Sequence, residues 1–271
     1  MLYMKRLYIF FIIFILFSGC TSNPLTGKRN MAFISNNQLF PMAFTQYSDF
    51  LNENTVVKGT ADAEMINRVG TRLADAAQKL LASEGHPDYL RDYRWEFTLV
   101  RDDSINAWAM PGGKIVFYTG ILPITRNEAG IAVVMGHEIA HAILNHGQQR
   151  MSAGILQQVG ALGVSIATAN QSPEAQALIM AAFGVSTTLG GTLPFSRQHE
   201  HEADEYGLLL MAIAGYNPDE AVPFWERMNA VGGGRTPEFL STHPSPPNRI
   251  ANLRKLAPEA KKKAAKFGVT F

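Results

Sequence analysis

The stretch that decides the fold is "AVVMGHEIAHAILNH", residues 132–146. Its apolar side chains recur as they do in a helix that is buried on most of its faces. Three polar side chains, His137, Glu138 and His141, interrupt this apolar pattern. Burying them without partners would cost several kcal/mol, because they would lose their hydrogen bonds to water. A metal ion is the partner that would offset this cost.

The spacing of the two histidines suits a shared metal ion. Residues four apart in a helix lie about 40° apart around its axis, so His137 and His141 project side by side. In the H-E-x-x-H arrangement, two neutral imidazoles bind Zn²⁺ and the adjacent carboxylate, here Glu138, serves as general base for the metal's water. The alternative is a polar helix face that arose by chance. We therefore expect one Zn²⁺ per chain on this helix.

A third protein ligand is expected elsewhere in the chain, because catalytic zinc takes three protein ligands and keeps one position open. The extended pattern with a third histidine six residues after His141 fails, since Gly147 occupies that position. His146 is one residue short of it. We expect His146 either at the surface or behind a ligand.

The segment "SRQHEHEADEYG", residues 196–207, is the convincing source of the third ligand. Glu200 and Asp204 lie one helical turn apart. Glu200 can therefore bind zinc, while Asp204 holds a ligand histidine by its other ring nitrogen. Glu202 and His201 stay open as alternative ligands, and Glu202 is otherwise expected to be a solvated helix charge.

The remaining segments predict a mostly helical α+β chain. An amphipathic helix is expected over residues 62–81, half-buried strands over 93–102 and 114–120, a turn at 111–113, and the metal-binding helix over about 127–146 with Gly147 as its stop. Residues 151–193 are rich in Ala, Gly and Gln and too interrupted for membrane spans. They are expected to form a loosely packed helical cap near the site or ordinary core.

The composition indicates one globular domain with some appended sequence. The chain has 271 residues, of which 46% are hydrophobic and 17% charged. Its net charge is only +1, with 24 Lys and Arg against 23 Asp and Glu. We therefore expect no nucleic-acid partner.

The N-terminal segment is typical of an exported lipoprotein. Lys5 and Arg6 precede an apolar run over residues 7–17, and small residues then lead to Cys20. This is a signal-peptide pattern, and the run is shorter than the roughly 20 residues that span a bilayer. Cys20 is the only cysteine, so it has no internal disulfide partner and is expected to carry a lipid. An uncleaved membrane anchor is the alternative.

The predicted domains are a signal peptide at 1–19, a lipidated tether at 20–35 and a zinc metallopeptidase domain at 36–271. Thr21, rather than aspartate, follows the cysteine. By the familiar sorting pattern, this predicts the periplasmic side of a bacterial outer membrane, with the inner membrane as the alternative.

Several stretches together resemble metallopeptidase family forty-eight, which includes CaaX prenyl endopeptidases, HtpX heat-shock proteases and Oma-type mitochondrial proteases. They are "CTSNPLTGKRN", "NAWAMPGGKIVFYTGIL", "GHEIAHAILNHGQQR", "SRQHEHEAD" and "STHPSPPNRI". The resemblance implies a zincin fold of the gluzincin type, with a small antiparallel sheet beside the active-site helix. It also implies that Glu200 is the third ligand. Because clear transmembrane helices are lacking, the chain looks like the periplasmic lipoprotein branch.

The expected chemistry is hydrolysis of peptide bonds. Glu138 would take a proton from the attacking water and return it to the leaving amine. His243, in "STHPSPP", is the candidate second donor to the oxyanion. It could instead occupy zinc's open position and silence the enzyme, or be a structural loop histidine. His243→Ala is expected to lower turnover without zinc loss, whereas zinc loss would favour the ligand role.

The resemblance also implies that substrate binds as an added strand. The expected edge carries Lys114, Ile115 and Val116, with Asn106 either positioning the substrate backbone or capping a turn. The leading hypothesis is a zinc endopeptidase that acts on unfolded or misfolded envelope proteins and is held to the membrane by a lipid on Cys20. The alternative is a latent or non-catalytic, chaperone-like zinc-binding lipoprotein that assists outer-membrane assembly.

Overall fold

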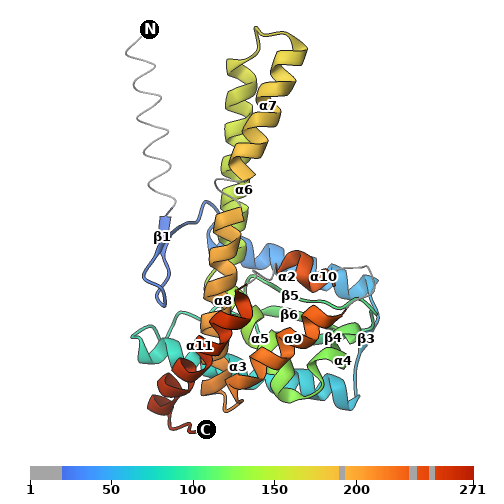
Figure 1. Cartoon of the computed structure of the whole chain (residues 1–271), viewed down its shortest axis with the longest axis vertical. Coiled ribbons are helices and arrows are strands. Elements are labelled where there is room, and N and C mark those ends of the chain that lie inside the picture. Colours follow the sequence, from blue (N-terminus) through green and yellow to red (C-terminus); the bar gives the residue numbers. More distant parts are fainter. Residues whose placement is uncertain (1–19, 189–192, 232–236, 244–247) are drawn as a thin grey trace.

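The helix that carries the opening stretch is α5 (Glu128–Ile143), and it lies at the centre of the computed structural model (Figure 1). The Asn127 side chain accepts a hydrogen bond from the Gly130 N–H and so caps its start. Every residue from position 130 to 143 is buried. The helix ends where Asn145 adopts a left-handed backbone conformation, with φ 58°. Gly147 is therefore not the stop, because a new helix has already begun at His146.

The structure describes residues 20–188, 193–231, 237–243 and 248–271. The predicted signal peptide at 1–19 lies outside these ranges. Besides α5, the described elements are β1 (Cys20–Ser22), β2 (Arg29–Met31), α2 (Asn36–Glu53), β3 (Val56–Val57), α3 (Ala61–Ser83), β4 (Glu96–Val100), β5 (Ala107–Met110), β6 (Lys114–Tyr118), η1 (Thr119–Ile121), α4 (Leu122–Thr125), α6 (His146–Ala167), α7 (Pro173–Thr187), α8 (Leu193–Ile213), η3 (Pro218–Glu220), α9 (Ala221–Ala230), α10 (Glu238–Thr242), α11 (Arg249–Ala264) and η4 (Ala265–Phe267). The prediction of a mostly helical α+β fold is confirmed.

Helix α8 packs directly on α5 through two glycines. A Cβ atom on Gly136 would lie 2.7 Å from the Gly207 carbonyl oxygen, and one on Gly207 would lie 2.9 Å from the His137 backbone nitrogen. Only glycine allows the two backbones to approach this closely. The approach brings the polar turns of α8 against the polar turns of α5.

The sheet is mixed and not antiparallel throughout. Its strand order is β3-β4-β6-β5, with β6 parallel to β4 and antiparallel to β5. The chain turns back after β5 at Gly112 and Gly113, whose φ angles are 82° and 94°, and β6 then inserts between β4 and β5. Strand β6 was expected at the edge of the sheet, and that prediction is wrong because the residues of β5 form a further strand that covers it.

Helix α3 confirms the predicted amphipathic helix. Its buried stripe includes Ile66, Val69 and Leu73, which follow the helical spacing. Gly70 lies within this stripe, and a Cβ atom there would lie 2.3 Å from the Phe97 ring. Helix α3 thus closes on strand β4 and joins the sheet to α5 in one hydrophobic core.

Helices α6 and α7 form a two-helix arm that projects away from the rest of the molecule (Figure 1). None of the 15 residues of α7 is buried, so the interpretation of residues 151–193 as ordinary core is wrong for the part that the structure describes. Among the described helices, none has both the length and the hydropathy that crossing a membrane requires.

The residues expected to form a tether are docked onto the body. Strands β1 and β2 form a small antiparallel hairpin. Within it, Asn23 Nδ2 donates to the Ile143 carbonyl at 3.0 Å, and the Tyr206 hydroxyl donates to the Leu25 carbonyl at 2.7 Å. Residues 23 and 25 therefore rest against the end of α5 and the middle of α8.

Candidate metal centre

Four buried side chains from three elements converge at the centre of the molecule. His137 and His141 come from α5, Glu200 from α8, and His243 from the end of α10. One potential ligand atom from each lies within 4.8 Å of all the others. The expected ligands His137, His141 and Glu200 are thus brought together, and His243 joins them.

The distances between these atoms match a tetrahedral metal site. His137 Nε2 lies 3.0 Å from His141 Nε2 and 3.2 Å from Glu200 Oε2. His141 Nε2 lies 3.3 Å from Glu200 Oε1. Ligand atoms about 2.0–2.2 Å from a tetrahedral zinc ion would lie about 3.3–3.6 Å from one another. The cluster therefore has nearly the size that such an ion requires.

The outer nitrogen of His137 is held by a buried carboxylate. His137 Nδ1 lies 3.1 Å from Asp204 Oδ1, as expected for Asp204. Burial would raise the pKa of Asp204, but the charge of Arg249 and the bond with His137 keep the pKa below its ordinary value. For His137, burial alone would lower the pKa, but the bonds to Asp204 and Glu200 raise the pKa to about 9. The site therefore favours positive charge at this imidazole.

Arg249 completes this side of the site, and its role could not be read from the sequence. Its guanidinium Nη2 donates to Asp204 Oδ1 at 2.6 Å, and the group lies 3.6 Å above the Trp225 ring. Only 1% of the residue is exposed. Arg249 begins α11 and lies 45 residues after Asp204 in sequence, so no local pattern pointed to the metal centre.

The outer nitrogen of His141 is held by a second chain of buried groups. His141 Nδ1 lies 2.7 Å from His146 Nδ1, and His146 Nε2 lies 3.1 Å from Glu202 Oε2. Glu202 also accepts from Lys28 and Gln198. Burial would raise the pKa of Glu202, but the bonds from His146 and Lys28 lower it to about 2. The expectation of a solvated Glu202 is wrong, and of the two positions open to His146 the buried one is found.

A further histidine, His199, was missed. Its ring stacks on His146 with centroids 4.0 Å apart, and its Nε2 lies 3.0 Å from Gln149 Oε1. It lies behind His146 and not among the ligand atoms. The "QHEHEAD" stretch is charged along its whole length, so the sequence did not show which of its residues turn inward.

A metal ion between the ligand atoms would supply the positive charge that a proton on His137 otherwise provides. If the Nδ1 atoms carry the protons that bond Asp204 and His146, the Nε2 atoms of both ligand histidines present lone pairs at 3.0 Å. Burial lowers the pKa of His141 well below its usual value, which favours this neutral form. Glu200 Oε2 is also buried without a partner of hydrogen-bond geometry. Two imidazoles and a carboxylate are a donor set typical of zinc.

Glu138 lies beside the ligand atoms without joining them. The residue is 2% exposed, and its Oε1 lies 3.3 Å from His243 Nε2. Burial raises the pKa of the Glu138 carboxyl, while His243 acts in the opposite direction. A raised pKa makes the Glu138 carboxylate a stronger base, as a group that accepts a proton from water must be.

His243 lies directly beside two of the expected ligand atoms. Its Nδ1 is 3.2 Å from both His137 Nε2 and Glu200 Oε1. The ring packs against Phe239, with centroids 4.7 Å apart. His243 is therefore close enough to His137, His141 and Glu200 to act as a fourth ligand.

The residues expected to bind a substrate strand are not available for that role. Lys114, Ile115 and Val116 lie in β6, inside the sheet, and are 8%, 0% and 0% exposed. Their backbones already pair with β4 and β5. Asn106 is buried, and its Oδ1 accepts from the Ala107 N–H at 2.9 Å. This bond to the adjacent residue is not the bond to the residue two positions on that caps a turn.

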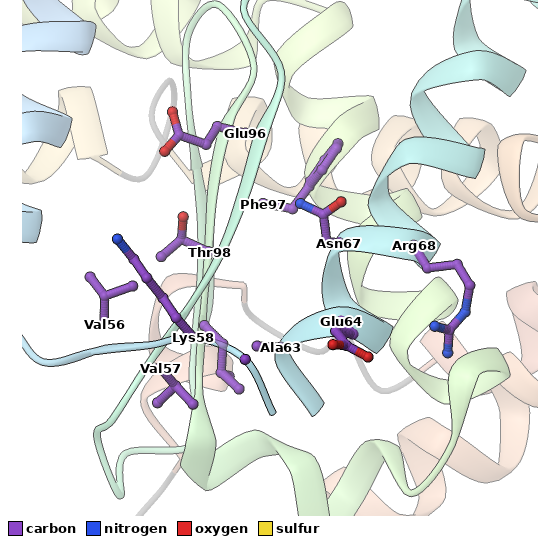
Figure 2. A pocket seen from close by; sticks show the side chains of 12 residues that line it. Val56, Val57, Lys58, Ala63, Glu64, Asn67, Arg68, Glu96, Phe97 and Thr98 are labelled. Carbon is purple, nitrogen blue, oxygen red and sulfur yellow. The ribbon is translucent and has the colours of Figure 1, made fainter. Parts of the chain in front are cut away.

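The free edge beside the metal centre belongs to β5. A narrow cleft with a volume of about 10 Å³ separates Ala109 and Met110 of β5 from His141 of α5. A second, larger hollow of about 440 Å³ lies at the opposite edge of the sheet, between β3, β4 and the start of α3 (Figure 2). Two of its charged residues are already paired, Glu96 with Lys114 and Arg68 with Glu128. Of these two hollows, only the cleft beside β5 adjoins the metal centre.

The comparison with protein families identifies the chain's relatives. The profile of the family described as Peptidase family M48 matches residues 63–257. The matched range includes the four converging side chains, Glu138 and Arg249.

Curated proteins similar to the chain are proteases. The mitochondrial metalloendopeptidase OMA1 of Schizosaccharomyces pombe is 37% identical over 177 residues, which cover 64% of this chain and 50% of that protein. The beta-barrel assembly-enhancing protease of Escherichia coli is 35% identical over 206 residues, covering 72% and 38%. The human metalloendopeptidase OMA1 is 27% identical over 264 residues, covering 93% and 48%. The chain thus spans about half the length, or less, of these relatives.

Proposed function

The chain belongs to peptidase family M48, and on that premise we propose that it is a zinc-dependent endopeptidase. The observation that carries the proposal is the convergence of His137, His141 and Glu200 on one point, with the unliganded carboxylate of Glu138 beside it. A structural zinc site would need no such base. The names of the relatives, which include metalloendopeptidases, support the same activity.

In the proposed mechanism, His137, His141 and Glu200 hold the ion, and their outer partners fix their orientation. Zinc bound there would act as a Lewis acid that polarises the peptide carbonyl and acidifies a water molecule. Glu138 accepts the proton of the attacking water at its free carboxylate oxygen. It then donates that proton to the leaving amine nitrogen, so that the same carboxyl serves as base and acid.

We propose that the substrate binds in extended form along the outer edge of β5, beside His141. The inner edge of β5 pairs with β6 in the register Ala109 to Ile115. Backbone pairing along the other edge would bind a peptide with little dependence on its sequence. Such an edge favours unfolded or flexible chains, because a folded protein rarely presents a free extended segment.

The proposed substrates are unfolded or misfolded proteins of the cell envelope. The name of the Escherichia coli relative supports this setting, and so does the N-terminal pattern that ends at Cys20. We propose a lipid on Cys20 that holds the chain at the periplasmic side of the outer membrane. Fatty-acid labelling and membrane fractionation of wild type and Cys20→Ser test the anchor. The variant should take up no fatty acid and should no longer be found with the outer membrane.

The direct test of the activity is cleavage of an unfolded protein by the full chain. Glu138→Gln removes the base while keeping the shape of the side chain, so cleavage should fall by about 10²–10⁴-fold. The bound zinc, measured by elemental analysis, should stay at one ion per chain. Equal cleavage by both proteins, or no cleavage by metallated wild type, would contradict the proposal.

A latent state is a second candidate, and the position of His243 favours it. With His243 Nδ1 3.2 Å from two ligand atoms, the cluster offers four ligands and leaves no open position. Opening the site would then require His243 to leave. We expect His243→Ala to cleave faster than wild type, with Ser241→Ala on the same short helix as the matched control. A fall in cleavage with zinc retained would instead support His243 as an oxyanion donor.

A further inference from the structure

The exposed apolar surface of the described chain is concentrated on the arm formed by α6 and α7. Eleven large hydrophobic side chains are exposed, and all but Met42 and Phe271 lie on these two helices. Leu178, Ile166 and Leu162 are 73%, 68% and 62% exposed. The members on the arm are Met151, Ile155, Leu156, Val159, Leu162, Ile166, Leu178, Ile179 and Val185. An apolar surface of this extent marks a site of interaction.

The arm is also almost free of charge. From Met151 to Thr188 the only ionisable side chain is Glu174, whereas about a quarter to a third of an ordinary soluble surface is charged. A protein partner of ordinary composition would find almost no charged groups to pair with. The absence of charge favours an environment that is itself apolar.

The two helices of the arm already pack against each other, so the side chains on its outer faces are not needed to hold the arm together. Gln157 Nε2 donates to Thr187 Oγ1 at 3.2 Å across the two helices. A Cβ atom on Gly160 would lie 2.9 Å from the Phe183 ring, which shows how closely the helices pack. On the outside of α6, the exposed residues 151, 155, 159, 162 and 166 follow one face. This stripe is roughly 22 Å long.

The N-terminal hairpin of β1 and β2 leads directly to the base of the arm. Cys20 pairs with Met31 in the β1–β2 hairpin. Two residues later, the Phe33 N–H donates to Ser152 Oγ in the first turns of α6. Cys20, the proposed site of the lipid, therefore belongs to a hairpin that contacts the start of the stripe. A membrane that holds the N-terminus would lie within reach of the arm.

We propose that the arm docks on a lipid bilayer, with the stripe of α6 and the exposed residues of α7 facing the acyl chains. The turn between the helices contains Asn170, Gln171 and Ser172, and Glu174 follows it. Inserting this polar tip into the hydrocarbon would be unfavourable. The arm therefore lies along the membrane plane, about 5–10 Å deep, as interfacial helices do.

A single protein groove fits these observations less well than lipid. The exposed apolar residues occur on both helices of the arm, whereas a helix seated in a groove buries one face. Because α6 begins at His146, behind the ligand His141, this surface would also set the height of the metal centre above the lipid.

The test places single fluorescent labels on the full chain in phosphatidylcholine vesicles. In a Cys20→Ser background, Leu162→Cys and Leu178→Cys each carry an environment-sensitive dye on the arm. Lys79→Cys, on the exposed side of α3, is the matched control. Lipids with nitroxide groups on the acyl chains near the headgroup should quench both arm labels several-fold more than the control label.

Each other outcome overturns the proposal. Equal quenching at all three positions would mean that the arm stays in water. Protection of the arm labels that grows with the protein-to-lipid ratio, together with energy transfer between labelled copies, would identify a second copy as the partner. Protection that occurs only after an unfolded protein is added would identify a polypeptide-binding surface.

Discussion

The metal centre and the arm depart from the usual distribution of polar and apolar residues in opposite directions. Around α5 and α8, charged side chains such as Glu200 and Arg249 are almost fully buried. On the arm, nine large apolar side chains are exposed, Leu178 by as much as 73%. Helix α6 belongs to both regions, since His146 at its start is 0% exposed and Ile166 near its end is 68% exposed. Each departure indicates a partner outside the polypeptide, an ion in one case and lipid in the other.

The largest effect that tests this contrast is expected at Arg249. Replacing Arg249 by Met removes the guanidinium that faces the buried Asp204 carboxylate at 2.6 Å and leaves His137 as the remaining partner. The free energy of unfolding should fall by about 3–5 kcal/mol, because removing one partner of a buried ion pair is costly. Urea unfolding monitored by circular dichroism measures the loss.

The control for this substitution lies on the same helix. Arg254→Met breaks the ion pair with Glu226. The side chains of Arg254 and Glu226 are 63% and 51% exposed. Solvent screens such a pair, so the change should stay within about 1 kcal/mol. Similar losses of unfolding free energy in Arg249→Met and Arg254→Met would show that burial does not make the ion pair at the metal centre more important for stability than an exposed pair.

A smaller effect is expected behind the second ligand histidine. His146→Ala removes the group that faces His141 Nδ1 at 2.7 Å. Loss of such an outer partner should weaken zinc binding by about 10- to 100-fold. Competition with a chelator of known affinity measures the change. His201→Ala, on the exposed side of α8, should bind zinc like wild type.

A charged pair at the surface end of α5 should contribute less. Arg68 donates two hydrogen bonds to Glu128 Oε1, and this contact lowers the pKa of Glu128 below its ordinary value of 4.5. A lowered folded-state pKa stabilises the fold above the unfolded-state pKa, and the gain is lost as the pH falls through the folded-state pKa. Since the carboxyl is partly exposed, Glu128→Gln should cost about 1 kcal/mol or less at neutral pH.

The pH dependence of that difference is the measurement. Unfolding free energies of wild type and Glu128→Gln should differ most at pH 7 and converge as the pH falls below 4.5. A difference that grows in acid would mean that another group stabilises the start of α5.

The smallest effect is expected on the arm. Leu162→Gln should change the free energy of unfolding by less than about 0.5 kcal/mol, because the side chain is 62% exposed. In α5, Ile139→Ala should cost about 2–5 kcal/mol, since that side chain is 0% exposed. If Leu162→Gln destabilised the protein as much as Ile139→Ala, the arm would be part of the core.

The parts of the site that could be predicted are those set by helical spacing. His137 and His141 share a face because they are four residues apart, and Glu200 and Asp204 do so for the same reason. The apolar stripe of α3 was predicted by the same periodicity. These patterns are local, so a single sequence contains them.

The parts that were missed depend on contacts between distant segments. Glu202 is a charged residue in a charged stretch, and only its contact with His146, 56 residues away in sequence, shows that it turns inward. Arg249 meets Asp204 across 45 residues. The four residues of β5 are too short a run to show that they cover β6. The sequence of residues 151–188 predicted helices, but it did not show that these helices would project away from the core.

The docked N-terminal hairpin fixes how far the body of the protein can lie from a lipid on Cys20. Asn23 is bonded to the last turn of α5, and only three peptide units separate it from Cys20. Cys20 itself pairs with Met31 in this hairpin, and an extended chain gains at most about 3.6 Å per residue, so a lipid at Cys20 would begin roughly 10 Å from Asn23. The proposed lipid anchor, held that close to the body, would confine cleavage to a thin shell at the membrane surface. Lengthening the segment between Cys20 and Asn23 should widen that shell without altering the chemistry inside it.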